Sequence, residues 1–288
     1  MKLVTYEWEG ADRVGVVLRD GVHDAGFEGT MRALIEQWPG RREEVETFAS
    51  RSPVVEAPHL RAPLRPRSMR DFLAFEGHMV HAMAALGRSV PDEWYSVPAY
   101  YKGMPDTVVG PDQEIPWPHY TASLDHELEL AAVIGRTGKD IPKLEALEYV
   151  FGYTIWNDFT ARDVQARELP VGMGPAKAKD WDGANVLGPA LVTSDELDIS
   201  DLRMQVRVNG ELWGEDRSSS MHHKFGDLIA YASMAQTLYP GDVLGSGTSE
   251  GGSGVELGRS LRPGDRIELD IEGIGTLRSR VGAAPRGD

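Results

Sequence analysis

Carboxylate side chains occur along the chain with the spacing that a metal site requires. In Glu127-Leu128-Glu129, the alternation of an extended strand points both glutamates to one face, where two like charges repel unless a cation or water separates them. Asp158 follows the predicted core strand 153–157, where an unpaired carboxylate is costly to bury. Oxygen ligands on separate elements suit magnesium, calcium or manganese better than zinc. A solvent-facing strand edge for the glutamates and a helix N-cap for Asp158 stay open as alternatives.

A histidine in the same part of the chain is a candidate base. His78 lies seven residues after Asp71 in a stretch typical of a helix, and residues seven apart share one helix face. A base beside a metal would fit this spacing. A hydrogen-bonded core histidine and a capping aspartate are the alternatives that the spacing leaves open.

A second motif indicates a different mechanism. Residues 247–251 (Gly-Thr-Ser-Glu-Gly) match the nucleophile elbow of serine hydrolases. In that fold the catalytic histidine follows the serine, whereas the last histidines of this chain, His222 and His223, precede Ser249. The order of the residues therefore favours the metal site over a serine nucleophile.

Composition limits the classes of partner and of metal ligand. The chain has 45 acidic and 30 basic residues, and its net charge of -15 would repel nucleic acid phosphates and anionic lipid headgroups. It has no cysteines, which excludes disulfides, thiolate nucleophiles and thiolate-bound zinc. The beginning of the sequence lacks a signal-peptide pattern, and no apolar run reaches the ~18 residues of a membrane span. A cytoplasmic protein without nucleic acid or membrane partners is therefore expected.

The first quarter of the chain predicts a small unit of its own. A hairpin is expected around Asp20-Gly21, and helix formers occupy two short stretches, 31–35 and 43–48. Several prolines within 53–66 then exclude a helix. These signals place a domain boundary near residue 66.

We therefore predict a small N-terminal domain over residues 1–65 and a catalytic domain over residues 66–285. The expected elements of the second domain are a strand at 125–135, a helix opened by Ile141 that continues through Leu144, Leu147 and Phe151, a strand at 153–157, a hairpin turning at Asn209-Gly210, a helix at 225–238, and strands after the Pro-Gly-Asp turns at Pro240 and Pro263. This succession predicts a strand-rich α+β protein.

Several of these segments occur in the order typical of one enzyme family. They are Asp71 to His78, Glu127 to Glu129, Asn157 to Gln165, Lys179 and the loop from Gly247 to Glu256. Together they resemble the fumarylacetoacetate hydrolase family over roughly residues 66 to 282. The resemblance implies a mixed β-sandwich roll preceded by the small N-terminal domain, and assembly as a homodimer.

The resemblance also implies a cofactor. It implies a divalent metal bound by Asp71, Glu127, Glu129 and Asp158. Magnesium is the first expectation for this ion, and manganese and calcium are the alternatives.

Further roles follow from the resemblance for residues outside the metal ligands. His78, oriented by Glu256, is expected to deprotonate a water, and Lys179 is expected to stabilise developing negative charge. The positions that match places of substrate contact in the family are Tyr101, Arg162, Gln165 and Thr248.

The implied reaction is metal-dependent hydrolysis of a carbon-carbon bond in a small acylpyruvate-like or 2,4-diketo acid. Leu73 stands where fumarylacetoacetase has a tyrosine that touches its substrate, which argues against fumarylacetoacetate itself. Decarboxylation, isomerisation or dehydration of a 2-keto acid is the alternative on the same fold, because these reactions use the metal without an attacking water. Hydration of a 2-keto acid on the same fold is a further alternative. A serine hydrolase that uses Ser249, or a non-catalytic binding relative, is a further alternative.

Overall fold

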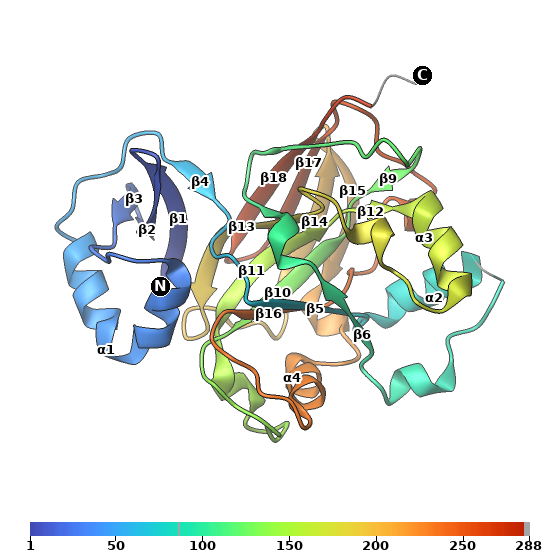
Figure 1. Cartoon of the computed structure of the whole chain (residues 1–288), viewed down its shortest axis with the longest axis horizontal. Helices are drawn as coiled ribbons and strands as arrows, with labels where there is room; N and C mark the ends of the chain where they lie inside the picture. The colour runs from blue at the N-terminus through green and yellow to red at the C-terminus, as the bar shows by residue number, and fades with distance from the viewer. Residues whose placement is uncertain (86, 285–288) are drawn as a thin grey trace.

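An N-terminal lobe lies beside a larger body in which two sheets pack face to face (Figure 1). The computed structural model describes residues 1–85 and 87–284, so residue 285, the predicted end of the catalytic domain, lies outside the described residues. The mixed, strand-rich sheets confirm the predicted α+β class and the sandwich arrangement.

The larger sheet runs through both the lobe and the body. Its main path is β3-β2-β1-β13-β11-β10-β16-β5-β6, with β4 paired to β1 and β7 paired to β13. Its strands are β1 (Lys2–Trp8), β2 (Ala11–Leu18), β3 (Gly21–Asp24), β4 (His59–Arg61), β5 (Ser68–Phe72), β6 (Tyr100–Gly103), β7 (Val108–Val109), β10 (Leu128–Ile134), β11 (Val150–Asp158), β13 (Asn185–Thr193) and β16 (Asp242–Gly245).

The second sheet has the order β15-β14-β17-β18-β8, and β12 pairs with β9 in a short ribbon. These strands are β8 (Glu114–Ile115), β9 (Leu124–Asp125), β12 (Thr160–Ala161), β14 (Arg203–Val208), β15 (Glu211–Arg217), β17 (Arg266–Ile271) and β18 (Gly275–Val281). The predicted hairpin at Asn209-Gly210 is confirmed, because both residues adopt positive φ between β14 and β15.

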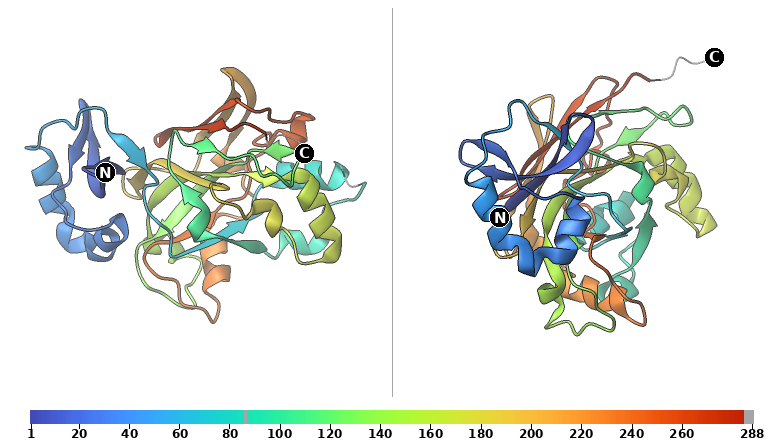
Figure 2. Two further views of the ribbon diagram at one scale, coloured as in Figure 1. Left: turned by 45° about the horizontal axis from the view of Figure 1, so that its top comes forward. Right: turned by 60° about the vertical axis from the view of Figure 1, so that its left-hand side comes forward.

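The helices are few. The α-helices are α1 (Met31–Ala49), α2 (Glu76–Ala85), α3 (Arg162–Glu168) and α4 (Phe225–Ser233), and the 3-10 helices are η1 (Asp92–Tyr95), η2 (Pro105–Thr107), η3 (Ala146–Tyr149), η4 (Leu169–Val171), η5 (Lys177–Lys179), η6 (Ser218–Ser220) and η7 (Val255–Leu257). Both α2 and α3 lie on the side of the body away from the N-terminal lobe (Figures 1 and 2).

The central strands lie between two hydrophobic cores. Along β10, Leu128 and Leu130 contribute to the core beneath the second sheet, whereas Ala131 and Val133 contribute to the core that α1 covers. Since side chains alternate along a strand, Glu129 projects from the same face as Ala131. This burial on both faces explains why β10 is apolar at nearly every position.

The N-terminal lobe shares hydrogen bonds and a core with the body. Lys2 and Leu3 of β1 pair with Val192 and Leu191 of β13, and α1 packs into the same core as the body's Trp156. The domain boundary near residue 66 stays a prediction.

Helix α1 differs from the two short helices predicted at 31–35 and 43–48. It is one continuous helix that contains Pro39, and the Thr30 hydroxyl caps it by accepting the Ala33 N–H at 3.2 Å. Leu34 and Val45 are both buried in the core that α1 covers. Packing of one face along the whole length therefore outweighs the hydrogen bond that a proline removes.

Two other predicted helices were also wrong in extent. The stretch after Ile141 forms only the short η3, because Leu144 is 96% exposed and has no core to pack against, and Phe151 lies in β11. Helix α4 ends at Ser233 instead of residue 238.

The predicted helix from Asp71 to His78 was wrong as well. Asp71 lies on β5, and the chain turns before α2 begins at Glu76. A hydrogen bond of 2.9 Å from the Ala74 N–H to the Ser246 carbonyl holds this turn against the neighbouring loop. Pairing with the sheet therefore overrides the helical spacing of these residues.

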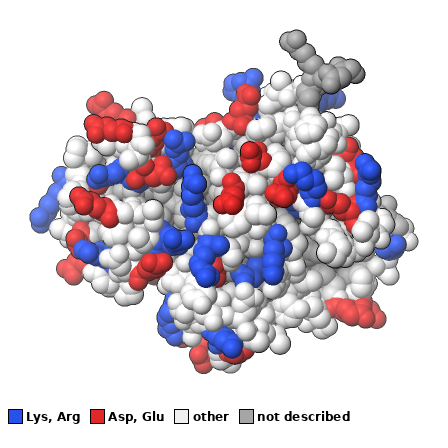
Figure 3. All heavy atoms as spheres, in the orientation of Figure 1, with Lys and Arg blue, Asp and Glu red and all other residues white. Residues whose placement is uncertain are grey.

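Charged side chains of both signs occur on the surface. On the face shown in Figure 3, acidic and basic residues are interspersed over the N-terminal lobe. Within the described residues, no helix has the combination of length and apolar character that crossing a bilayer demands.

Trp156 provides a test of the central core. It is fully buried on β11, and its indole N–H donates to the Asn185 Oδ1 at 2.9 Å. We expect Trp156→Phe to lower the free energy of unfolding by about 2 kcal/mol, because the Asn185 oxygen loses its donor and a small cavity remains.

Urea unfolding followed by circular dichroism measures this loss. Tyr153→Phe is the matched control, because no hydrogen bond of the Tyr153 hydroxyl occurs among the described residues; its effect should stay within about 0.5 kcal/mol. Equal effects of the two substitutions would contradict the importance of the indole hydrogen bond.

Candidate metal centre

Four buried carboxylates meet on one face of the large sheet. Asp71 lies on β5, and Asp158 ends β11. Glu127 directly precedes β10, and Glu129 is its second residue. One oxygen from each lies within 4.8 Å of one from every other, and none of the four residues is more than 4% exposed. The structure thus brings together all the predicted metal ligands.

A glycine makes room for this cluster. Strand β16 lies between β10 and β5, and its Gly245 is in register with Asp71. A Cβ at Gly245 would lie 2.3 Å from Glu129 Oε2 and 2.7 Å from the Trp156 ring. Any larger residue would therefore push Glu129 out of the cluster.

The unsatisfied oxygens of the cluster fit a hard cation. Within the described residues, Asp71 Oδ1, Asp158 Oδ1 and both carboxylate oxygens of Glu129 are buried without a hydrogen-bond partner. Buried carboxylates without partners are strongly unfavourable, and oxygen-only ligand sets are what magnesium, manganese and calcium prefer. These four residues are therefore suited to hold a divalent metal.

The environment separates the pKa values of the four carboxyls. Burial raises the pKa of Asp71 and of Glu129 well above the ordinary value, and neighbouring carboxylates raise both further. Burial also raises the pKa of Asp158 to about 6, although Lys179 opposes this shift. Burial alone would raise the pKa of Glu127, but the charges of Lys179 and Arg162 reverse the shift and hold it well below its usual range.

Lys179 and Arg162 form ion pairs with carboxylates of the cluster. The Lys179 ammonium donates to Glu127 Oε2 at 2.7 Å, to Thr160 Oγ1 at 2.8 Å and to Asp158 Oδ2. Burial alone would lower the pKa of Lys179, but Asp158 and Glu127 raise it above its ordinary value, so the ammonium stays charged.

The Arg162 guanidinium lies 2.6 Å from Glu127 Oε1 and donates its Nε–H to Asp125 Oδ2 at 2.9 Å. It therefore pairs with Asp125 and Glu127, and not with Asp163, which instead accepts from the Thr121 hydroxyl at 2.5 Å. Asp125 was not predicted. Its position two residues before Glu127 is the only signal in the sequence that could have identified it.

A histidine-glutamate pair lies beside the carboxylates. His78 Nδ1 is 2.5 Å from Glu256 Oε1, and the Glu256 carboxylate also accepts the Gly251 N–H and the Ser253 hydroxyl, each at 2.8 Å. Burial alone would raise the pKa of Glu256, but His78 and these donors hold it below its ordinary value. Because an ionised carboxylate only accepts, Nδ1 carries the proton and Nε2 is left as an acceptor.

One cavity of about 470 Å³ connects these groups. Its lining includes Asp71, Glu127, His78, Glu256, Lys179 and Arg162, together with the predicted substrate contacts Tyr101 and Gln165. The Tyr101 hydroxyl donates to Asp158 Oδ2 at 2.6 Å, which joins the cavity wall to the cluster. Thr248 is buried and is not among the lining residues, so its role as a substrate contact stays a prediction.

The alternative nucleophile, Ser249, has no activating partner. It is 1% exposed, it does not line the cavity, and its hydroxyl makes no hydrogen bond to any residue of the described part of the chain. His78, which could serve as a base, is instead engaged with Glu256. The geometry therefore disfavours a serine hydrolase.

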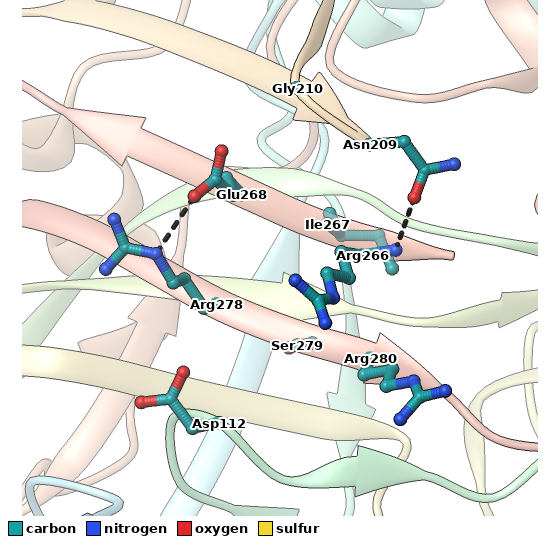
Figure 4. A pocket seen from close by; sticks show the side chains of 9 residues that line it. All are labelled: Asp112, Asn209, Gly210, Arg266, Ile267, Glu268, Arg278, Ser279 and Arg280. Atoms are coloured by element: carbon teal, nitrogen blue, oxygen red, sulfur yellow. Dashed lines mark hydrogen bonds and ion pairs between the residues drawn. The ribbon is translucent and has the colours of Figure 1, made fainter. Parts of the chain in front are cut away.

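A second hollow lies on the outer face of the second sheet (Figure 4). Arg266 and Arg280 occupy facing positions on β17 and β18, and Arg278 pairs with Glu268 at 2.9 Å. This hollow holds neither a carboxylate cluster nor a histidine, so the chemistry belongs to the cavity at the four carboxylates.

Most of the chain matches one family model. Residues 68–282 match the model described as fumarylacetoacetate (FAA) hydrolase C-terminal. The match spans β5 to β18 and therefore includes the four carboxylates and the histidine-glutamate pair.

Whole-length comparisons agree with this match. The chain is 37% identical over 298 residues to the mitochondrial oxaloacetate tautomerase Fahd2a of Rattus norvegicus, covering 98% of this chain and 91% of the relative. It is 41% identical over 164 residues to the oxaloacetate tautomerase YisK of Bacillus subtilis, covering 56% and 53%. It superposes with a TM-score of 0.83 and 30% identity on a fumarylacetoacetate hydrolase from Exiguobacterium antarcticum, covering 98% and 99%.

The raised pKa values predict how pH acts on the ion-free protein. A carboxyl whose pKa is raised by folding contributes stability that is full below its unfolded pKa and is lost as pH rises through its folded pKa. The pKa is raised by folding for three of the carboxyls, those of Asp71, Glu129 and Asp158. The pKa of Glu127 is lowered instead, so this residue changes the stability in the opposite direction, and only below about pH 4.5. Chelator-treated protein should therefore lose stability as pH rises above about 4, through the pKa of about 6 of Asp158 and further for Asp71 and Glu129.

Ion binding should show the opposite trend, because the ion displaces protons from the same carboxyls. The affinity should rise by up to about tenfold per pH unit for each proton released. Melting temperatures with chelator and with saturating magnesium, measured across this pH range, check both trends. An ion-induced shift that does not change with pH would contradict them.

Glu129→Gln tests the cluster with little change of shape. The ion-free variant should lose less stability than the ion-free wild type as pH rises, because an amide at position 129 cannot take on a buried charge. The stabilisation by magnesium should disappear in the same variant, since one of the four ligands can no longer carry charge.

Glu46→Gln on α1 is the matched control, because Glu46 is exposed and far from the cluster in the fold. It should behave as wild type with and without ion. A Glu129→Gln protein that still gains full stability from magnesium would rule out Glu129 as a ligand.

Proposed function

Because the chain belongs to the fumarylacetoacetate hydrolase family, we propose that it is a metal-dependent hydrolase that cleaves a carbon-carbon bond in a small acylpyruvate-like or 2,4-diketo acid. The observation that carries this proposal is the His78-Glu256 pair, which lines the same cavity as Asp71 and Glu127 of the carboxylate cluster. A base that is already oriented beside a cation site is what hydrolysis by an activated water requires.

We propose Asp71, Glu127, Glu129 and Asp158 as the residues that hold the ion, and magnesium as the resident ion. A divalent ion held there supplies positive charge that polarises a neighbouring carbonyl and offsets the charge of a departing carbanion.

His78 would move the protons of the reaction. Its Nε2 accepts a proton from water while Glu256 stabilises the imidazolium through Nδ1. The water oxygen bonds to the acyl carbonyl carbon, the bond between that carbon and its neighbour breaks, and the imidazolium returns the proton to the departing carbon. The products are a carboxylic acid and a 2-keto acid, so that one water is consumed and His78 is regenerated.

Positive and polar groups around the cavity would orient the substrate. Lys179 stays charged and lies against Asp158 and Glu127, where it favours negative charge developing on a nearby oxygen. Arg162 holds Gln165 by donating to its Oε1 at 3.1 Å, and both side chains line the cavity. We assign Gln165 and Tyr101 to substrate contact on this basis.

Tautomerisation of a 2-keto acid is the second candidate. Both the rat and the Bacillus relatives are oxaloacetate tautomerases. On this chain the same His78 would move a proton between a carbon and an enol oxygen, and no bond to water oxygen would form. Decarboxylation, hydration and dehydration are further alternatives. We also propose that the chain assembles as a homodimer.

Single-residue kinetics test the proposed base. We expect His78→Ala to lower kcat for acylpyruvate hydrolysis by about 10² to 10⁴. Chelation should abolish turnover, and magnesium should restore it. Ser249→Ala, the matched control for the serine mechanism, should keep kcat within about threefold of wild type. Turnover that survives chelation but vanishes in Ser249→Ala would overturn the metal account.

Products formed in ¹⁸O-labelled water separate the two reaction classes. Hydrolysis incorporates one labelled oxygen into the carboxylic acid that is released. A protein that only interconverts keto and enol forms, and that leaves every carbon-carbon bond intact, would establish the tautomerase instead.

A further inference from the structure

The cavity is lined by apolar side chains as well as by the charged groups. The apolar side chains include Leu73, Met79, Ala82, Met83, Leu169 and Val255. These residues come from the turn after β5, from α2, from η4 and from η7, so that segments far apart in sequence converge on one apolar subsite.

Three apolar side chains of this subsite are left partly uncovered by the protein. Leu73 is 38% exposed, Leu169 is 44% exposed and Val255 is 48% exposed, although all three line the cavity. Scattered apolar residues on a surface are ordinary, but convergent ones around a cavity indicate an apolar ligand group. Their exposure leaves apolar area that a ligand could bury at about 25 cal/mol per Å².

The positive groups that line the cavity are already paired. Lys179 contacts Glu127 and Asp158, and Arg162 contacts Asp125 and Glu127. His81, which also lines the cavity, lies 3.8 Å from Glu250 and 3.9 Å from Glu256. The two permanently charged side chains of this lining, Lys179 and Arg162, are therefore already matched by carboxylates of the protein.

The overall charge of the site leads to the same conclusion. The four cluster carboxylates and Glu256 outnumber the two permanently charged cations, Lys179 and Arg162, by three. With a divalent ion bound, the net charge of the site is still negative. One ligand carboxylate beside the ion is favourable, but a second one at the far end would be desolvated without a partner.

We propose that the substrate of this site is an acylpyruvate-like acid whose acyl end is apolar, with its keto-acid end at the carboxylate cluster and its hydrocarbon end between Leu73 and Val255. This inference rests on the proposed function and narrows it. It places dicarboxylic substrates, including those with an oxaloacetate-like second carboxylate, among the poor ligands of this chain.

Turnover of a matched substrate series tests the proposal. For acetyl-, butanoyl- and hexanoylpyruvate with saturating magnesium, kcat/KM should rise about threefold per added methylene until the subsite is filled. Succinylpyruvate, which resembles butanoylpyruvate but ends in a carboxylate, should be at least about tenfold poorer than butanoylpyruvate. Equal or better turnover of succinylpyruvate would overturn the proposal.

Binding without turnover gives an independent readout. N-butyloxamate carries a keto-acid-like end and an apolar tail, whereas N-(2-carboxyethyl)oxamate carries a charged tail of similar length. Calorimetric titration of the magnesium-loaded protein should show tighter binding of N-butyloxamate, with a negative heat-capacity change from apolar burial. Tighter binding of the charged analogue would contradict the apolar subsite whatever the reaction.

Charge-introducing variants locate the effect in the subsite. Leu73 and Val255 come from distant segments of the chain, and both are partly exposed, so a lysine from Leu73→Lys or Val255→Lys can be solvated in the folded chain. Each should shift the ratio of succinylpyruvate to butanoylpyruvate turnover by about fivefold toward the dicarboxylate. Leu144→Lys, at a 96% exposed position outside the cavity, is the matched control and should leave the ratio unchanged.

The outcomes separate this proposal from the function on which it rests. If no acylpyruvate is cleaved but N-butyloxamate still binds more tightly than the charged analogue, the hydrolase assignment fails and the apolar subsite stands. If acylpyruvates are cleaved with no preference for apolar tails, the hydrolase assignment stands and the subsite fails. An unchanged ratio in both lysine variants would also overturn the subsite.

Discussion

The mutual repulsion of four buried carboxylates is the constraint around which the rest of the site is arranged. Two unit charges 4.8 Å apart repel by about 3 kcal/mol at an effective dielectric constant near 20, and here every pair among the four lies within that distance. Lys179 and Arg162 offset part of this repulsion, and protonation offsets more in the ion-free chain. A divalent cation removes it most completely. The fold thus maintains a local charge that only a cation fully compensates.

The sheet supplies the positions that this arrangement needs. Strands β5, β10 and β11 present their carboxylates on one face, and Gly245 on β16 leaves the space between them open. Because these strands also lie between two hydrophobic cores, the ligands have little freedom to move apart and relieve their repulsion. The loop that follows β16 carries Glu256, which orients His78, so the proposed base is positioned by the same region of the chain as Gly245.

Local patterns in the sequence predicted the site better than the elements that carry it. Alternation around Leu128 placed Glu127 and Glu129 on one face, and the apolar run before Asp158 identified a core strand, because both signals are confined to a few residues. Asp71 and His78 were assigned to one helix because their spacing fits one, but pairing with β16 makes Asp71 part of a strand. Tertiary contacts of this kind, like the core that keeps α1 continuous through Pro39, leave no local trace in the sequence.

Anomalous X-ray scattering from crystals grown with manganese tests the central claim most directly. The account predicts one strong peak among Asp71, Glu127, Glu129 and Asp158, with carboxylate oxygens at about 2.0 to 2.6 Å from it. A peak bound elsewhere, or no peak at full manganese saturation with these carboxyls hydrogen-bonded only to one another, would contradict it.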